Sequence, residues 1–405
     1  MATEAVSVSW RRSINPFIQD VEVIREGDKN GYGGVFRIVL KGGREVCAIA
    51  LPHYNSSRTG PTWAYLVDCQ GWTLIDAGSQ GAQEALEKGL DTLGRKVTDL
   101  ERVVITHGHQ DHDGNTYDLL KASGAELWTH EMYFHFLPYN HNERGLDTAS
   151  PLHRVIAESR KREEEWRNLS ANASAHQHWT DHDRRYQEGR RRIALGEVPA
   201  HPIRDGEALG EMRFHYTPGH AIDELCIALD GVVFTGDHVL PQISPHPTFI
   251  QTFPEALQYT LPLEHQRPEE HYGLSCYLRS LGKVLALSID TTVFPAHRLY
   301  NHDRLHLRNL HRAREIVRHH VKRLERSLEA IDEGSDTVEA ITGNIFPARK
   351  LSGGGMLSAI SEVVSHLELL ADSGDIQVSE DGAVKRTGTH RFYQEIEAMT
   401  GHPIG

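Results

Sequence analysis

The stretch that most constrains this chain is VVITHGHQDHDGN, residues 103–115, in which a histidine-rich turn follows a short apolar run. Imidazole nitrogen and carboxylate oxygen are the ligands that zinc and iron take in hydrolase sites. His107 and His109 are two residues apart, so in an extended turn both side chains can point the same way. Asp111 and His112 follow as the turn enters a helix. The segment can therefore supply two histidines to one metal ion and an Asp–His pair to a second.

Three later segments place further candidate ligands at the ends of strands. The motifs TPGH, VVFTGD and TVFPAH put His220, Asp237 and His297 directly after apolar runs or tight turns. Each residue taken alone could be an ordinary polar residue at a strand end. In this order after HxHxDH, the three favour a binuclear metal site over coincidence, even in a chain with 27 histidines.

Composition narrows the classes of function. The chain has 405 residues and a formal charge of -13, which argues against nucleic acid as the main partner. Its four cysteines form no CxxC pair, so neither a disulfide framework nor sulfur-ligated zinc is expected. No apolar run approaches the roughly 18 residues of a membrane span, and the first residues lack the apolar core of a signal peptide. We expect a cytoplasmic protein that does not bind membranes.

Strand-like and helical segments alternate along residues 34–130, a pattern typical of a layered α/β fold. Residues 137–200 are highly charged with helical spacing and predict a helical insertion. A long helix is expected over 303–334, opening at an Asp303 cap and ending at Gly334. Two further helices and a hairpin with a DG turn suggest a small winged-helix-like domain. The predicted division is a catalytic domain at 1–302, a linker helix at 303–334 and a C-terminal domain at 335–405.

The ordered motifs THGHQDH, TPGH, FTGD and FPAH resemble those of the metallo-β-lactamase superfamily, in particular its glyoxalase II-like hydrolases, over residues 35–300. The resemblance implies an αββα sandwich with the metal site at one edge of the two sheets. The ligand sets that it implies are His107, His109 and His220 for one metal, Asp111, His112 and His297 for the other, and Asp237 for both. Asp76 in LIDAGS matches an aspartate that orients a ligand histidine; a turn-capping role is the alternative.

The segments YGLSCYLRSLGKVLAL and MLSAISEVVSHLELLADSGDIQV resemble lactamase-β-like hydrolases that carry a C-terminal winged-helix domain. This chain departs from the family pattern at two places. Asn115 stands where the family usually has a second glycine, and the insertion at 137–200 lengthens the interval between His112 and His220. Because the insertion springs from the metal-bearing face, we expect it to form part of a lid.

The resemblance implies two divalent metal ions, zinc first, with iron or manganese as alternatives, since nitrogen and oxygen ligation accommodates all three. A water bridging two such ions ionises near neutral pH, and the resulting hydroxide would attack a carbonyl. Asp111 is a candidate for accepting a proton as the reaction proceeds, besides its role as a ligand. These expectations describe a binuclear metal-dependent hydrolase.

Three substrate classes fit such a centre. The leading expectation is a thioester of coenzyme A, an acyl carrier or glutathione, which would make the partner a small acyl substrate. The alternatives are a lactone or other cyclic ester or amide, and a phosphodiester or RNA. Residues 351–386 carry six acidic residues against two basic ones, the opposite of what a phosphate-binding winged helix needs. The C-terminal domain is therefore expected to pack against the cleft or to join subunits of a homo-oligomer.

Other residues leave alternatives open. The arginine-rich pieces RKREEEWRN and RRYQEGRRR could hold phosphates or a carboxylate. Three histidines of the insertion are interpreted as solvated polar residues rather than a third metal site: His176, His178 and His182. Four residues near the ligands are candidates for substrate contact, with a surface or packing role as the alternative: His238, His246, Tyr300 and His302. A site retained only as structure is disfavoured because all seven ligand positions are present.

Overall fold

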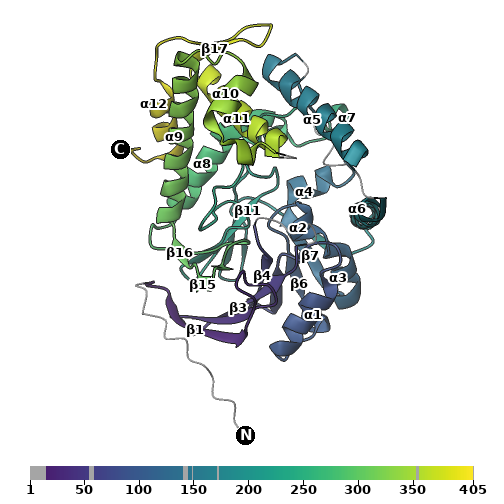
Figure 1. Ribbon diagram of the computed structural model, residues 1–405. Helices are drawn as coiled ribbons and strands as arrows, with labels where there is room; N and C mark the ends of the chain where they lie inside the picture. Colours follow the sequence, from purple (N-terminus) through teal and green to yellow (C-terminus); the bar gives the residue numbers. More distant parts are fainter. Residues whose placement is uncertain are drawn as a thin grey trace.

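The computed structural model describes residues 15–53, 59–139, 145–147, 149–170, 173–352 and 355–404, with side chains left out of the description over 166–180. Within these ranges two β-sheets lie face to face, and helices cover the outer side of each (Figure 1). This arrangement is the αββα sandwich expected from the sequence motifs. The first helix of the insertion and the C-terminal helices lie at one end of the sandwich, and the second helix of the insertion lies along its side.

The first sheet contains eight of the described strands, ordered along the chain. Strands β1 to β5 pair antiparallel, and β5 to β8 pair in parallel. The strand bounds are β1 Ile18–Arg25, β2 Val35–Leu40, β3 Glu45–Leu51, β4 Thr62–Asp68, β5 Trp72–Ile75, β6 Arg102–Val104, β7 Glu126–His130 and β8 Ala200–Ile203. Strand β1 was not anticipated from the sequence, because its outward positions are charged and its apolar positions are only half-buried.

The second sheet has the order β16-β13-β12-β11-β10-β9. Its pairs are antiparallel except for β12 and β13, which run in parallel. The strand bounds are β9 Ala208–Leu209, β10 Met212–Tyr216, β11 Leu225–Leu229, β12 Val232–Phe234, β13 Thr292–Phe294 and β16 Arg308–Asn309. The parallel pair matters for function because it brings the carboxyl ends of β12 and β13 together.

Strand β3 shows why the two sheets sandwich a core. Its sequence EVCAIAL is apolar on both faces, as expected for a strand with a layer on each side. Val46, Ala48 and Ala50 belong to the cluster between the sheets, whereas Ile49 and Leu51 belong to the cluster beneath the helices. Aromatic rings fill the space between the sheets, where the Tyr65 and Phe234 centroids are 5.1 Å apart. Burial of this two-sided apolar surface fixes the register of the strand.

Helices close the outer faces of the two sheets. The outer side of the first sheet packs against α1 Gln83–Thr92 and α3 Thr116–Ser123. The outer side of the second packs against α8 Gly273–Leu285 and α9 His311–Asp332. Short helices occupy the connections, and their bounds are α2 Gln110–Asp113, α4 Glu131–Phe136, α7 Glu255–Gln258, η1 Val97–Asp99, η3 Leu263–His265 and η4 Pro268–Glu270.

The long helix expected over 303–334 begins later than predicted. His302 and Asp303 have φ of 50° and 58°, a left-handed turn that joins β14 Tyr300–Asn301 to β15 Arg304–Leu305. The chain then adds β16 to the second sheet before α9 starts at His311. The Asp303 cap was therefore wrong, because asparagine, histidine and aspartate also tolerate the left-handed conformation of tight turns. The predicted end is confirmed, since the helix stops just before Gly334 at φ +98°.

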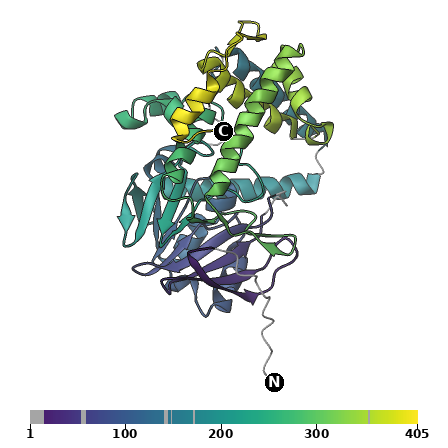
Figure 2. The same ribbon diagram turned by 90° about the vertical axis from the view of Figure 1, so that its left-hand side faces the viewer.

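The tail, residues 335–404, continues into the same apolar core as α8 and α9 (Figure 2). Its described elements are α10 Val338–Ile345, η5 Ala348–Lys350, α11 Gly355–Asp372, β17 Ile376–Val378, β18 Val384–Arg386 and α12 Phe392–Thr400. The two predicted helices and the hairpin are confirmed, with Gly382 at φ +88° in the turn. Helix α12 was not anticipated. The division of the chain into separate domains stays a prediction.

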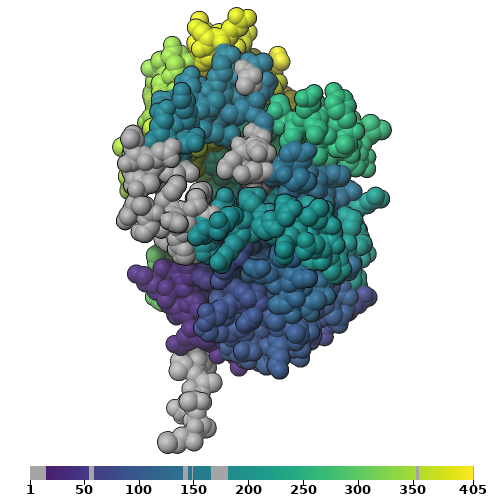
Figure 3. Space-filling model, turned by 90° about the vertical axis from the view of Figure 1, so that its right-hand side faces the viewer, coloured from purple at the N-terminus to yellow at the C-terminus, as the bar shows by residue number. Residues whose placement is uncertain are grey.

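The insertion forms two helices, α5 Pro151–Ser170 and α6 Ala173–Ala194, as the charge pattern predicted. Helix α5 reaches the tail, where His153 Nε2 lies 2.7 Å from Glu368 Oε1. Helix α6 reaches the first sheet's helical layer, where Arg192 donates to the hydroxyl of Tyr117 at 2.7 Å. Figure 3 shows the insertion on one face of the molecule, between the N-terminal layer and the tail.

Candidate metal centre

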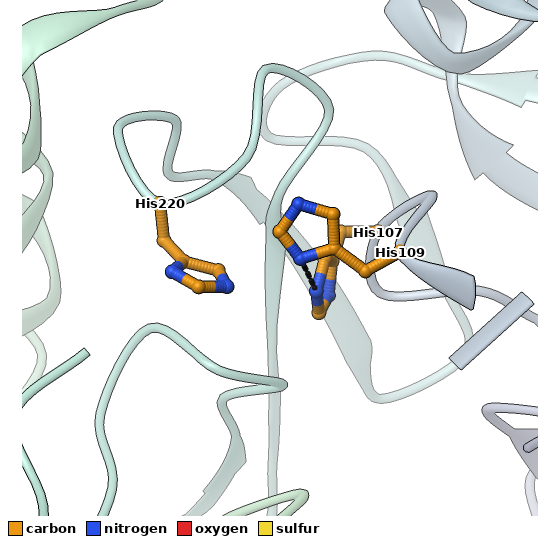
Figure 4. Close-up of side chains that lie close together, drawn as sticks. All are labelled: His107, His109 and His220. Atoms are coloured by element: carbon orange, nitrogen blue, oxygen red, sulfur yellow. Dashed lines mark hydrogen bonds between the residues drawn. The ribbon is translucent and has the colours of Figure 1, made fainter. Parts of the chain in front are cut away.

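The histidine-rich turn sits between β6 and α2, and its backbone is fixed from two sides. Ile105 N donates to Trp128 O on β7 at 2.9 Å, and Gly108 N donates to the Asp223 carboxylate at 2.8 Å. His109 then caps α2, which carries the two remaining polar positions of the motif. These contacts hold the His107 Nε2 and His109 Nδ1 atoms 3.0 Å apart (Figure 4).

His220 completes the first cluster from the turn between β10 and β11. Its ring centroid lies 4.9 Å from that of His109 and 5.3 Å from that of His107. The Nδ1 atom of His220 donates to the His246 carbonyl at 2.9 Å, which directs Nε2 toward the other two rings. One ligand atom from each of the three residues lies within 4.8 Å of the others. The first predicted set is thus brought together.

The second cluster consists of Asp111, His112 and His297, which satisfy the same 4.8 Å limit. His297 follows β13, and its Nδ1 donates to the Pro61 carbonyl at 3.1 Å. This leaves His297 Nε2 facing Asp111 Oδ2 at 3.0 Å. His112 Nε2 lies 3.7 Å from the same oxygen. The second predicted set is also brought together.

Asp237, at the carboxyl end of β12, lies between the two clusters. Its Oδ2 is 3.6 Å from His220 Nε2, and its Oδ1 is 3.6 Å from His112 Nε2 and 3.5 Å from His297 Nε2. One oxygen therefore faces each cluster, which is the geometry that a bridging carboxylate requires.

Asp76 supports the second cluster from behind. Its Oδ2 accepts from His112 Nδ1 at 2.9 Å, and its Oδ1 accepts from Thr106 N at 2.8 Å. Asp76 adopts φ +65°, so the backbone turns sharply to point the carboxylate inward. A carboxylate that holds Nδ1 fixes the tautomer and leaves Nε2 to bind a metal.

Glu224, at the start of β11, supports the first cluster and was not found from the sequence. Its Oε2 lies 3.5 Å from His107 Nδ1, and its Oε1 accepts from Asp237 N at 3.0 Å. Complete burial and the neighbouring Asp237 raise the pKa of Glu224 well above its ordinary value. Its sequence context, IDELCIAL, carries no motif, because only the folded chain places it beneath the metal turn.

His53 is the second residue that sequence reasoning missed. It follows β3, and its Nε2 lies 3.0 Å from Asp111 Oδ2. The signal was available, since LPHY puts a histidine just after an apolar strand, as TPGH and FPAH do. Asp111 thus has His53 on one side and His297 on the other.

The charges of the site are arranged to accept cations. Burial opposes ionisation of Asp111, but His112, His297 and His53 outweigh it and hold its pKa well below the usual value. His297, His112 and His220 likewise lower the pKa of Asp237, against the effect of burial. Burial and the surrounding rings lower the pKa of His107 well below 6.5, so its ring stays neutral. Against the effect of burial, the neighbouring carboxylates raise the pKa of His112 and His297. Because ionised carboxylates and neutral imidazoles are the forms that bind metals, a bound ion would displace protons from these two rings.

Unpaired polar atoms test whether the residues fit metal ions. Among the described residues, three buried atoms that face the centre have no hydrogen-bond partner: His112 Nε2, His220 Nε2 and Asp237 Oδ1. Buried polar atoms are normally paired. Their common direction, together with the all-nitrogen and oxygen donor set, fits two divalent ions.

The four candidate substrate contacts lie in different environments. His238 is fully buried, with its ring 5.0 Å from that of Tyr277 on α8. His246 holds His220 through its carbonyl, and its Nε2 contacts the Ser358 carbonyl on α11 at 2.9 Å. The Tyr300 ring packs 5.5 Å from that of Phe36, and His302 is exposed in the β14–β15 turn.

Helix α6 of the insertion contacts the histidine-rich turn and α2 directly. The Tyr186 hydroxyl donates to Gly108 O at 3.2 Å, and Arg190 Nη1 lies 3.0 Å from Asp113 Oδ2. This contact, and not a separate metal cluster, is what the described part of the insertion brings to the centre. His182 lies on α6, whereas the side chains of His176 and His178 fall outside the described residues.

Comparison with known proteins agrees with this geometry. A model of the metallo-beta-lactamase superfamily matches residues 57–297, a range that includes all seven predicted ligands. The probable metallo-hydrolase YqjP of Bacillus subtilis (strain 168) is 40% identical over 72 residues, which span 17% of this chain and 22% of that relative. The aligned stretch therefore covers about a fifth of the relative's length.

The solved structure of the metallo-beta-lactamase family protein TTHA1429 from Thermus thermophilus shares the fold. The two chains are 23% identical with a TM-score of 0.54, and the match covers 84% of this chain and 98% of the other.

Across the part of the chain that is described, no helix is long and apolar enough to span a membrane. The family model matches more than half of the residues. The chain therefore belongs to the metallo-beta-lactamase superfamily.

Proposed function

We propose that the protein hydrolyses a thioester of coenzyme A, an acyl carrier or glutathione at a binuclear metal centre. The observation that carries the binuclear part is the position of Asp237, whose two oxygens face two different ligand clusters at 3.5–3.6 Å. A carboxylate shared in this way suits a pair of ions better than a single one.

When bound, two divalent ions would supply a water of lowered pKa and a Lewis acid for the carbonyl oxygen. His107, His109 and His220 would hold one ion, Asp111, His112 and His297 the other, and Asp237 both. Asp111 is the residue that we propose takes up a proton, as the sequence motif implies, and its Oδ2 lies between His53 and His297 at 3.0 Å from each. Those two rings orient the carboxylate toward the centre.

The distribution of charge supports an acyl substrate over RNA. Two exposed arginines of α6 are already paired, Arg184 with Asp181 at 2.9 Å and Arg191 with Glu188 at 2.9 Å. The insertion therefore offers less free positive charge than its sequence suggests. The tail has the acidic excess noted above, which disfavours binding along a phosphate backbone.

The tail is proposed to be a winged-helix-like module of the kind found in lactamase-β-like, glyoxalase II-like hydrolases. Its order of helices followed by the β17–β18 hairpin supports this assignment. The contact of His246 with Ser358 supports a role for α11 in walling the cleft, since the carbonyl of His246 also holds a candidate ligand.

The test is turnover by protein reconstituted with zinc, iron or manganese on acyl-CoA and glutathione thioesters, lactones and an RNA oligonucleotide. His109→Ala removes a ligand, and His201→Ala, a half-exposed histidine on β8, is the matched control. We expect the wild type and His201→Ala to hydrolyse thioesters and His109→Ala to be inactive. Turnover confined to lactones or RNA would refute the substrate class and leave the metal centre standing.

A further inference from the structure

A second group of metal-ligating side chains lies outside the centre described above. His130, Glu131 and His265 each offer one nitrogen or oxygen atom, and these atoms lie within 4.8 Å of one another. The same limit describes the two clusters of the main centre, and no residue belongs to both groups. His130 ends β7, Glu131 begins α4, and His265 ends η3, so the group joins two segments far apart in the sequence.

The group is enclosed rather than solvated. His130 is 1% exposed and His265 is 7% exposed. The ring of His130 is stacked on Tyr216 with centroids 3.7 Å apart, which fixes its plane. His265 Nε2 lies 3.1 Å from Glu131 Oε1, and its Nδ1 has no hydrogen-bond partner among the described residues. A buried imidazole left one hydrogen bond short suits a ligand better than a packing residue.

The hydrogen bond that holds the ring of His130 is weak. Its Nδ1 accepts from Met132 N at 3.3 Å. Coordination through Nδ1 would replace that weak contact with a metal bond. Exposed Arg204 lies 3.6 Å from Glu131 Oε2, which leaves Oε1 for a ligand.

We propose that His130, Glu131 and His265 bind a third divalent transition-metal ion, separate from the binuclear centre. Two imidazoles and one carboxylate form a donor set that zinc takes with water in the remaining position. The ion would tie the β7–α4 junction to the segment around η3. The ion would add to the apolar packing that already holds this segment, in which Leu257 and Leu261 are buried against Met132 while Leu263 is 83% exposed.

The test counts metal ions bound by the full chain after zinc reconstitution and gel filtration, using mass-spectrometric metal analysis. We expect three equivalents in the wild type and two in His265→Ala and in Glu131→Gln, with at least tenfold weaker binding of the third. The matched control is His201→Ala, because His201 pairs with Glu207 in the loop that follows β8 and belongs to none of the groups of metal-ligating side chains found among the described residues. It should keep three equivalents.

One further variant separates this proposal from the proposed function. His109→Ala should lose zinc from the main centre and retain the ion at His265, whatever substrate the enzyme uses. Glu131→Gln preserves side-chain shape and decides the matter if His265→Ala fails to fold, as judged by circular dichroism. An unchanged zinc count in Glu131→Gln, whether the wild type binds two or three ions, would overturn the proposal.

Discussion

Replacing Arg190 by methionine tests whether the insertion supports the metal turn. Arg190 is 3% exposed, and its guanidinium donates to Asp113 Oδ2 and to Phe136 O, each at 3.0 Å. Methionine keeps most of the side-chain volume and removes the charge, so the carboxylate of Asp113 is left buried without its cation. Breaking a buried pair from one side costs about 3–5 kcal/mol.

The lower end of that range applies here, because Asp113 can take up a proton and so remove the unpaired buried charge. Burial, only partly offset by Arg190, already raises the pKa of Asp113 to about 6. Without the arginine that pKa rises further, and the carboxyl is neutral at pH 7. We therefore expect the free energy of unfolding to fall by about 3 kcal/mol. Asp113 follows a ligand directly, so metal affinity should fall about 10–100-fold as well.

The assay is urea unfolding of the metal-free protein followed by circular dichroism, with zinc titration of the folded protein alongside. Arg191→Met is the control, because Arg191 neighbours Arg190 in the chain but is exposed and pairs with Glu188 on the surface. Such a surface pair contributes about 0–1 kcal/mol. If Arg190→Met and Arg191→Met unfold at the same urea concentration, the insertion does not anchor the turn and the reasoning fails.

Three further predictions concern the centre and the core. Asp76→Asn should weaken zinc binding about 10–100-fold by releasing the imidazole it holds, seen by competition with a chelating dye. Gly236→Ala should destabilise the protein by about 1–3 kcal/mol more than Gly33→Ala. Both glycines have positive φ, but a Cβ at Gly236 would lie 2.6 Å from Glu224 Oε1, whereas a Cβ at Gly33 would meet open space. Equal urea midpoints for the two variants would contradict this. Burial lowers the pKa of His366 to about 4. Between about pH 6.5 and pH 4 the unfolded chain therefore binds more protons than the folded protein, and the free energy of unfolding falls by up to about 3 kcal/mol as the pH is lowered. His366→Gln should reduce this dependence of the urea midpoint on pH.

The positions of the candidate ligands could be predicted from the sequence because each follows an apolar strand. The end of a strand fixes where the following loop begins. Neighbouring parallel strands end at the same edge of the sheet, as β12 and β13 do, so the loops that carry Asp237 and His297 begin side by side. A polar residue that follows an apolar run in the sequence could therefore be placed at the edge of a sheet. The same rule, applied to LPHY, would have added His53.

Other parts of the site could not be predicted, because their partners are distant in sequence. Glu224 is a single acidic residue beside a strand, and only the packing of β11 against the metal turn gives it a role. Arg190 looked like one arginine among many in a charged helix, yet it is buried against Asp113. The start of α9 was misplaced for a related reason, since the pairing of Arg308 and Asn309 with β13 overrode the local helical pattern.

The distribution of ligands over both sheets has a consequence for biogenesis. His107 to His112 follow the first sheet's β6, whereas His220, Asp237 and His297 come from loops of the second, up to 190 residues later (297 minus 107). An emerging chain therefore exposes the histidine-rich turn long before the complete ligand sets exist. Tight loading must wait until the two sheets dock, so bound metal stabilises only the assembled sandwich. Metal supply during synthesis should accordingly govern the yield of folded protein.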